Sequence, residues 1–141
     1  MKTMKTAIKV AVLLIIGGLI YCGLEIAWRG HTHWTMGVVG GICFVLIGGI
    51  NEWFPWTMPL YQQGLIGAGI VTAAELVAGL ILNVLLGLDI WDYSTMPLNF
   101  MGQICLPFCL LWILLSVVAV VLDDWLRYWI FGEERPHYVM R

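Results

Sequence analysis

The sequence predicts an all-α integral membrane protein whose four transmembrane helices form one antiparallel bundle. Of its 141 residues, 61% are hydrophobic and only 11% are charged, whereas soluble domains are roughly 45–50% apolar and about 25% charged. Four apolar segments each reach the roughly 20 residues that a helix needs to cross a bilayer. Six of the seven Lys and Arg residues fall on one side of the resulting topology.

The predicted spans cover about residues 7–28, 34–53, 60–86 and 98–122. Short connections join them, so consecutive helices should run antiparallel within a single membrane domain, 1–141. The first segment resembles a signal peptide, but its apolar run continues to Trp28, and Tyr21 is bulky where a cleavage site has a small residue. We therefore interpret it as a retained helix.

Basic residues predict the orientation of the spans. The termini carry six of them and the outer loops only Arg29, which places both termini in the cytoplasm. Residues 123–141 are predicted to form an interfacial tail, in which Asp123 and Arg127 can pair and Gly132 ends the helix. A net charge of −2 without a basic stripe argues against nucleic-acid binding. The expected surroundings are the lipid bilayer.

Polar residues that interrupt the third span are the most informative feature. A charge at mid-bilayer costs at least about 2.5–3.5 kcal/mol, so such residues normally face the interior of a bundle. Glu75 lies near the middle of this span, and Asn83 lies two turns nearer its outer end. Both belong to a small or polar stripe with steps of three or four residues: Ala68, Thr72, Glu75, Gly79, Asn83 and Gly87.

Further polar residues gather near the predicted outer side. Tyr21, Glu25 and Arg29 share a face of the first span, and Glu25 and Arg29 are ordered for an ion pair. We expect Asn99 and Gln103, four apart, to share a face of the fourth span. Together with the loop between the third and fourth spans, at 87–97, these residues predict a ligand pocket that opens outward and has Glu75 as its floor. The predicted ligand is small and either polar or amphipathic. The predicted ligand-binding residues are Glu75, Asn83, Glu25, Arg29, Tyr21, Asn99, Gln103, Asp92 and Tyr93.

Metal and enzyme sites have weaker support. His31 and His33 are two residues apart, and a third ligand could come from Glu25, Asp89 or Asp92, but two ligands do not make a site, so no metal is predicted. The four cysteines lie in apolar runs and are interpreted as small buried hydrophobes. Phosphate-loop and nucleophile-elbow motifs are absent, which argues against an enzyme, and no cofactor is predicted.

Three blocks of sequence are similar to one known family. They are LEIAWRGHTHW at 24–34, INE with PW at 50–56, and WDYS, PLN and GQIC between 91 and 105. Together they resemble small bacterial membrane proteins classed as type IV ABC-transporter permeases, over about residues 18–134. The resemblance implies a multi-pass protein of the bacterial cell membrane, a working pathway built from oligomers, and a cytoplasmic ATPase or another membrane subunit as partner.

The function expected from the polar residues and the resemblance is that of a transport component, a permease-like or solute-binding subunit. Two other functions stay open at this point. One is a membrane-embedded enzyme that uses His31, His33, Asp89 and Asp92 at the outer face. The other is a structural or sensory subunit of a larger membrane complex.

Overall fold

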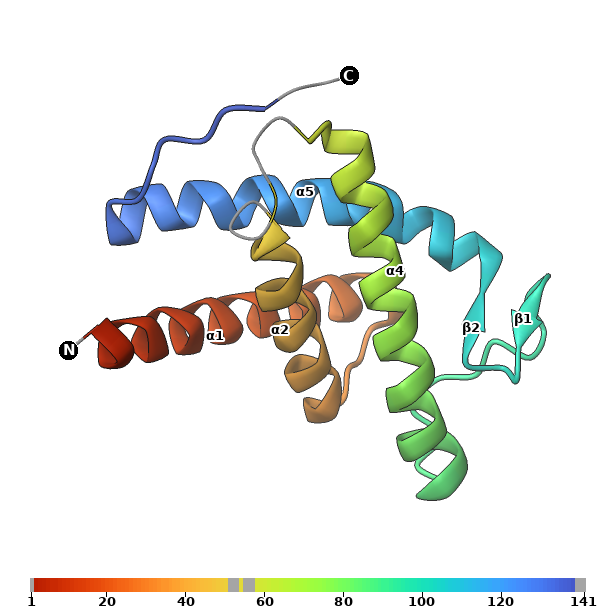
Figure 1. The fold of residues 1–141 in the computed structure, drawn as a ribbon. Helices are drawn as coiled ribbons and strands as arrows, with labels where there is room; N and C mark the ends of the chain where they lie inside the picture. Colours follow the sequence, from red (N-terminus) through yellow and green to blue (C-terminus); the bar gives the residue numbers. More distant parts are fainter. Residues whose placement is uncertain (1, 51–53, 55–57, 139–141) are drawn as a thin grey trace. The chain divides into compact units, whose positions relative to one another are not determined.

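A computed structural model describes residues 2–50, 54 and 58–138. Three of its helical segments are long and apolar enough to cross a membrane: Met4–Arg29, Leu60–Leu85 and Leu106–Phe131. The chain is therefore a helical membrane protein. Figure 1 shows its elements in order: α1 (Lys2–Arg29), α2 (Trp34–Gly48), α4 (Leu60–Gly79), the π-helix η1 (Leu80–Leu85), β1 (Asn99–Phe100), β2 (Ile104–Cys105) and α5 (Leu106–Phe131).

The chain divides into two compact units. The terminal unit comprises Met1–Trp56 and Ala119–His137, and the central unit comprises Thr57–Val118 and Tyr138–Arg141. Helix α5 contributes its first half to the central unit and its second half to the terminal unit. Whether the whole chain acts as one membrane domain stays a prediction.

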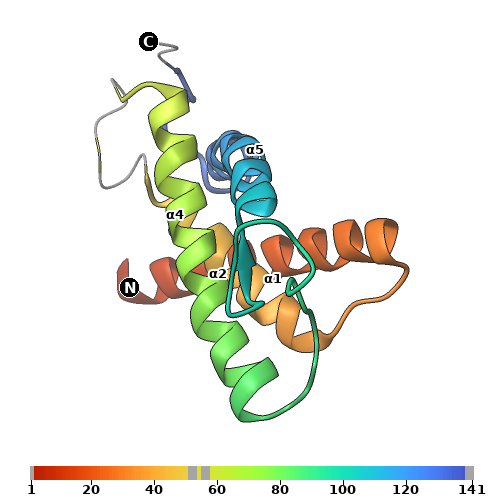
Figure 2. The same ribbon diagram turned by 90° about the vertical axis from the view of Figure 1, so that its right-hand side faces the viewer.

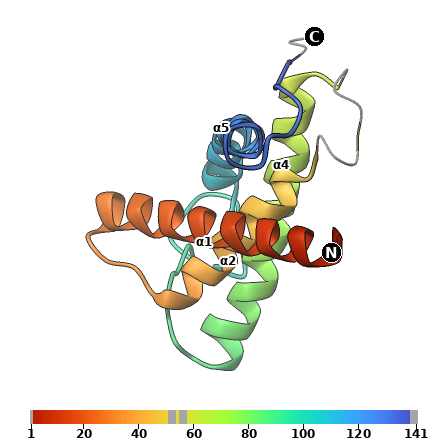
Figure 3. The same cartoon turned by 90° about the vertical axis from the view of Figure 1, so that its left-hand side faces the viewer.

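In the terminal unit, glycines let α1 and α2 approach closely (Figure 3). A Cβ atom on Gly18 would lie 2.6 Å from the carbonyl oxygen of Gly37, and one on Gly41 would lie 2.5 Å from that of Leu14. Any larger residue at Gly18 or Gly41 would push the two backbones apart. Small residues serve the same purpose between helices in lipid, where dispersion rather than hydrophobicity drives packing.

The second predicted span is shorter in the structure than in the prediction. Helix α2 has 15 residues, about 22 Å at ~1.5 Å per residue, against roughly 30 Å of bilayer hydrocarbon. Residues 51–53 of the predicted span lie outside the described residues. At its start the helix is capped by His33, whose Nδ1 accepts a hydrogen bond from the Thr35 backbone N–H at 3.3 Å.

The third predicted span, about 60–86, agrees closely with α4 followed by η1. Helix α4 begins after Pro59, which has extended backbone angles and cannot continue a preceding helix. At Leu80 the regular helix widens into a π-helix of six residues that contains Asn83. Such π segments are rare and recur at functional sites.

The fourth predicted span, about 98–122, is wrong at both ends, because α5 runs from Leu106 to Phe131. Residues 99–105 instead form a hairpin beside the start of α5 (Figure 2), in which Asn99 pairs with Cys105 and Phe100 with Ile104. The two central turn residues, Met101 and Gly102, both have positive φ, as in a type I′ turn. The Asn99 side chain accepts from the Gly102 N–H at 3.1 Å, a local bond that competes with helix formation.

The predicted interfacial tail also differs from the structure, because its first nine residues continue α5. Asp123 is 0% exposed and Arg127 is 7% exposed, rather than solvated. Their predicted pairing is confirmed at 2.7 Å, and it removes the reason for the helix to stop where the charges begin. The predicted stop at Gly132 is confirmed as well: its φ of +66° is left-handed, and its N–H donates to the Tyr128 carbonyl. Residues 139–141 lie outside the described residues.

Candidate functional site

The candidate site is built around the carboxyl group of Glu75, in the central unit. Glu75 is the sixteenth residue of the 26-residue segment Leu60–Leu85 and is only 5% exposed. Its Oε2 accepts a hydrogen bond from the Tyr93 hydroxyl at 3.0 Å, and its Oε1 accepts one from the Trp112 indole N–H. Two uncharged donors from different segments therefore fix the position and orientation of this acid.

A row of three aromatic rings lies beside the carboxyl group. The rings of Tyr93 and Phe108 are stacked, with centroids 4.8 Å apart and an angle of 14° between their planes. Phe108 in turn meets Trp112 at 6.2 Å and 35°. Tyr93 and Trp112 thus turn their polar edges to Glu75, while their ring faces line up with Phe108.

Two amide side chains form a second polar group, further along the same helix. Asn83 donates from Nδ2 to Gln103 Oε1 at 2.9 Å and accepts at Oδ1 from the Ile90 N–H at 2.6 Å. The Trp91 indole N–H donates to the Gln103 carbonyl at 3.0 Å. Gly79 makes room for this group, since a Cβ atom there would lie 2.5 Å from Gln103 Oε1. The amides thereby attach the loop before α5 to the end of the third span.

The part of the predicted polar stripe from Thr72 to Asn83 therefore faces the hairpin and the first half of α5. Thr72 is hydrogen-bonded to the Cys109 sulfur at 3.3 Å, and Glu75, Gly79 and Asn83 all contact residues between 90 and 112. These hydrogen bonds engage four of the predicted site residues in contacts within the central unit: Glu75, Asn83, Tyr93 and Gln103. Gln103 reaches the group from the turn of the hairpin rather than from a helix, which corrects its predicted position.

Asp92 and Asn99, also predicted ligand residues, shape the loop instead. The Ser94 backbone N–H donates to Asp92 Oδ1 at 2.8 Å, and this hydrogen bond lowers the pKa of the exposed Asp92 carboxyl group. Asn99 donates from Nδ2 to the Met96 carbonyl at 2.9 Å. Both side chains therefore fold the connection that presents Tyr93 to Glu75, and Asn99 does so from strand β1, not from a helix.

The predicted site residues of the first span lie in the terminal unit. Arg29 Nη1 and Glu25 Oε2 are 3.3 Å apart, so the predicted ion pair is confirmed. Tyr21 packs against α2: a Cβ atom on Gly40 would lie 2.6 Å from the Tyr21 ring. The aromatic side chain therefore replaces the missing side chain of Gly40 in the α1–α2 contact.

Sequence reasoning missed two members of the site, Phe108 and Trp112. Both lie within an apolar segment, where an aromatic residue is as easily explained by lipid contact as by a site. Trp112 carried a usable signal, because tryptophans favour the headgroup level and this one lies well inside its span. Its indole N–H would need a hydrogen-bond partner at that depth, and Glu75 supplies it.

The histidine hypothesis gains no structural support. No group of three or more His, Cys, Asp and Glu side chains that could hold a metal ion occurs in the described part of the chain. His33 is engaged with Thr35, whose hydroxyl lies 2.6 Å from His33 Nδ1. The cysteines fit the interpretation as small hydrophobes in part: all four are free thiols, and Cys43 and Cys105 are buried.

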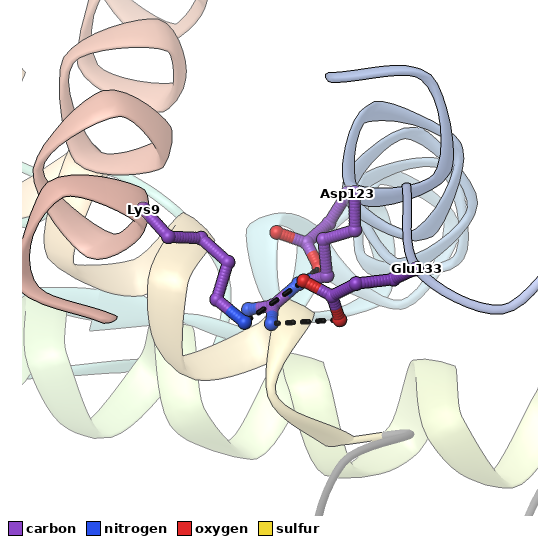
Figure 4. Close-up of polar contacts among 4 residues, drawn as sticks. Lys9, Asp123 and Glu133 are labelled. Atoms are coloured by element: carbon purple, nitrogen blue, oxygen red, sulfur yellow. Dashed lines mark hydrogen bonds and ion pairs between the residues drawn. The ribbon is translucent and has the colours of Figure 1, made fainter. Parts of the chain in front are cut away.

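A separate charge network lies in the terminal unit and links α1 to the end of α5 (Figure 4). Lys9 Nζ is 2.8 Å from Glu133 Oε2, and Arg127 Nη1 is 4.0 Å from Glu133 Oε1. Arg127 also holds Asp123 through Nε. A Cβ atom on Gly48 would overlap the Asp123 carboxyl group, so the end of α2 is in contact with this network as well.

Comparison with known proteins identifies the family of the chain. The model of the family "Putative ABC-transporter type IV" matches residues 34–131, more than half of the chain. The chain belongs to this family. The ABC-transporter family match begins at the start of α2 and ends at the last residue of α5, so it includes Glu75, Asn83, Tyr93, Gln103 and Trp112.

The match to this ABC-transporter family is shorter than the resemblance expected from the sequence, which extended over about 18–134. Most of the motif at 24–34 and the Glu133 end of the charge network fall outside it. No curated protein and no solved structure matches the chain. Family membership together with apolar helices of spanning length is consistent with a component of membrane transport.

Proposed function

We propose that the chain is a solute-binding membrane subunit of an ABC-type transporter and that the Glu75 group contacts the solute. The observation that carries the proposal is a carboxyl group buried within a membrane span and oriented by donors from two other segments. An ionisable residue at such depth is costly and is usually retained for function. Membership of an ABC-transporter family gives that function its direction.

Each polar group takes a distinct role in this proposal. Glu75 supplies the charged contact, and Asn83 with Gln103 supplies amide donors and acceptors that select the solute. Asp92, Tyr93 and Asn99 belong to the connection through which the solute enters. Tyr21, Glu25 and Arg29 are proposed to contribute near the outer end of the first span.

The same proposal assigns partners to the chain. It carries no phosphate-binding loop of its own, so a cytoplasmic ATPase would supply the energy. Three spanning helices with a shorter fourth are few for a solute pathway, which favours a homo-oligomer or a second membrane subunit. The membrane is proposed to be the bacterial cell membrane, and the sequence resemblance to small bacterial membrane proteins supports this proposal.

The test is solute binding by the purified protein in lipid nanodiscs. Four radiolabelled solutes represent the main classes: choline, alanine, glucose and inorganic phosphate. We expect at least one to bind and Glu75→Gln to weaken its binding by about tenfold or more, because a hydrogen bond to a charged group contributes roughly 1.5–3 kcal/mol. Cells that express the chain should accumulate the same solute, and cells with the Glu75→Gln variant should not.

The matched control is Val77→Ala, an exposed position on the same helix. This change should leave binding and uptake at the level of the unchanged protein. Binding that is equal in the protein and the Glu75→Gln variant, or no binding of any of the four solutes, would contradict the proposal.

A further inference from the structure

The hairpin before α5 carries exposed apolar side chains around its turn. Leu98, Phe100 and Met101 are 76%, 55% and 59% exposed. These three residues are called the hairpin tip below. Single exposed apolar residues are common on protein surfaces, but several of this size within residues 98–101 indicate a surface that an apolar partner covers.

The hairpin tip is continuous with the apolar surface of α5. No Asp, Glu, Lys, Arg or His occurs from residue 93 to residue 122, a stretch that contains the hairpin and most of α5. Strand β2 leads directly into α5, where Leu106 and Leu110 are exposed. Helix α5 is long and apolar enough to span, so these side chains are expected to face lipid. Acyl chains therefore fit the tip better than a protein partner does, because a protein interface usually has a polar rim.

Contacts with the third span indicate the depth of the hairpin tip. In the turn, Gln103 Oε1 accepts from Asn83, and a Cβ atom on Gly79 would lie 2.5 Å from the same oxygen. Gly79 and Asn83 precede the end of the segment Leu60–Leu85 by six and two residues, which is roughly 3–9 Å along the helix. The 26 residues of that segment measure about 39 Å against roughly 30 Å of hydrocarbon, so each end of a centred helix projects about 4–5 Å beyond it. The tip therefore lies close to the boundary between hydrocarbon and headgroups.

The backbone of the turn has hydrogen-bond partners within the protein. The carbonyl groups of residues 100–103 all accept hydrogen bonds. Their donors are, in order, the backbone N–H of Gln103, the side-chain amide of Gln103, the backbone N–H of Tyr93 and the indole N–H of Trp91. The Asn99 side chain likewise uses its amide nitrogen and its oxygen on nearby backbone groups. Unpaired backbone groups are costly near hydrocarbon, and this pairing removes that cost for the turn.

We propose that the hairpin tip inserts among the acyl chains of the leaflet at the η1 end of the third span, held there by the preference of Leu98, Phe100 and Met101 for hydrocarbon. In the predicted topology this is the outer leaflet. The inference goes beyond the proposed transport function and does not depend on it, because it uses no contact of the solute-binding group. Since the Tyr93 N–H donates to the Gly102 carbonyl at 2.7 Å, an anchored tip also holds the connection that carries Tyr93.

The test is NMR of isotope-labelled methionine methyl groups in the protein in lipid nanodiscs. The signals of Met101 and Met4 are assigned by their loss in Met101→Leu and Met4→Leu. One sample contains phospholipid with a nitroxide near the glycerol end of an acyl chain, and another contains a gadolinium chelate in the water. We expect the Met101 signal to lose most of its intensity with the nitroxide lipid and little with the chelate. Met4 is 69% exposed and lies beside Lys5, outside the predicted first span, so its signal should respond in the opposite way.

A substitution tests what holds the hairpin tip in lipid. Phe100→Asp adds a charge, which is costly among acyl chains. It should reduce the loss of Met101 signal caused by the nitroxide lipid and increase the loss caused by the chelate. Phe100→Leu keeps an apolar side chain and should leave both losses unchanged. Each variant is first shown to keep the helical circular dichroism spectrum of the unchanged protein.

The possible results separate lipid from the other surroundings of the hairpin tip. If Met101 responds to the chelate rather than to the nitroxide lipid, the tip lies in water and the inference is overturned. If Met101 responds to neither while Met4 responds as expected, a protein surface such as a second copy of the chain covers the tip, which also overturns it. If Phe100→Asp behaves like Phe100→Leu, the apolar side chains do not determine the depth of the tip, and the proposal fails on that ground.

Discussion

Gly48 is the residue at which a single added methyl group should matter most in the terminal unit. Its Cβ atom would overlap the carboxyl group of Asp123, which is fully buried and bound to Arg127. Gly48→Ala must therefore displace either the helix end or the buried ion pair. We expect the free energy of unfolding to fall by about 1–3 kcal/mol, as for overpacked cores, measured by unfolding with sodium dodecyl sulfate in mixed micelles.

Gly23→Ala is the matched control, because it makes the same change at another helical position of the same unit. A Cβ atom at Gly23 meets no atom within 4 Å. Since alanine is the better helix former, this variant should be at least as stable as the unchanged protein. A similar loss of stability in both variants would contradict the assignment of the effect to the contact between Gly48 and Asp123.

At the scale of single residues, the sequence predicts the polar contacts better than the aromatic ones. Burial of Glu75 follows from the cost of a charge in hydrocarbon, and the pairing of Asp123 with Arg127 follows from helical spacing. Phe108 gives no such signal, because an apolar residue in an apolar span is equally suited to lipid and to a site. The hydrogen bond between Trp112 and Glu75 joins residues 37 positions apart and depends on how two helices pack.

Among the elements, the segment after α5 offers the clearest test. Ion pairs of Glu133 with Lys9 and Arg127 attach this segment to the rest of the terminal unit. Glu133→Gln should loosen the end of α5, so the amides of Gly132 and Glu133, which donate to Tyr128 and Arg127 carbonyls, should exchange faster with deuterium. About 2- to 5-fold is expected, since a partly exposed ion pair contributes up to roughly 1 kcal/mol.

The neighbouring variant Glu134→Gln provides the comparison for this exchange measurement by mass spectrometry. The Glu134 side chain is 63% exposed, and its ion-pair contact is with His137 at 3.8 Å. It should exchange like the unchanged protein. Raised salt concentration should also speed exchange in the unchanged protein but not in the Glu133→Gln variant; the absence of this difference would argue that the ion pairs do not hold the segment.

Element boundaries could be predicted where local chemistry determines them, as at Gly132 and after Pro59. They could not be predicted for the hairpin at 99–105. Apolar neighbours such as Leu98 and Phe100 suit a span on hydropathy alone, yet Leu98 and Met101 adopt positive φ and Asn99 bonds to nearby backbone instead. Hydropathy measures the preference for lipid and is silent about such turns, so it placed the start of the fourth span eight residues too early.

At the scale of the whole molecule, the ion pair between Lys9 and Glu133 bears on whether the chain crosses the membrane an even or an odd number of times. Lys9 lies near the beginning of α1, and Glu133 lies just after the end of α5. Their ion pair, within the terminal unit, brings these two ends of the spans together, so we expect both to face the same side of the membrane. Three crossings would leave the ends on opposite sides, so we expect an even number.

We therefore expect the α2 segment to provide a fourth crossing, although the 15 residues of the helix are fewer than the roughly 20 that a span usually needs. The excess of basic residues at both termini predicts that this shared side is the cytoplasm. A green fluorescent protein fused to the C-terminus should fluoresce, whereas alkaline phosphatase at the same position should be inactive. An N-terminal epitope tag should be protected from protease added outside intact spheroplasts. An active phosphatase fusion combined with a protected N-terminus would mean three crossings, and the contact between Lys9 and Glu133 could not then form in the membrane.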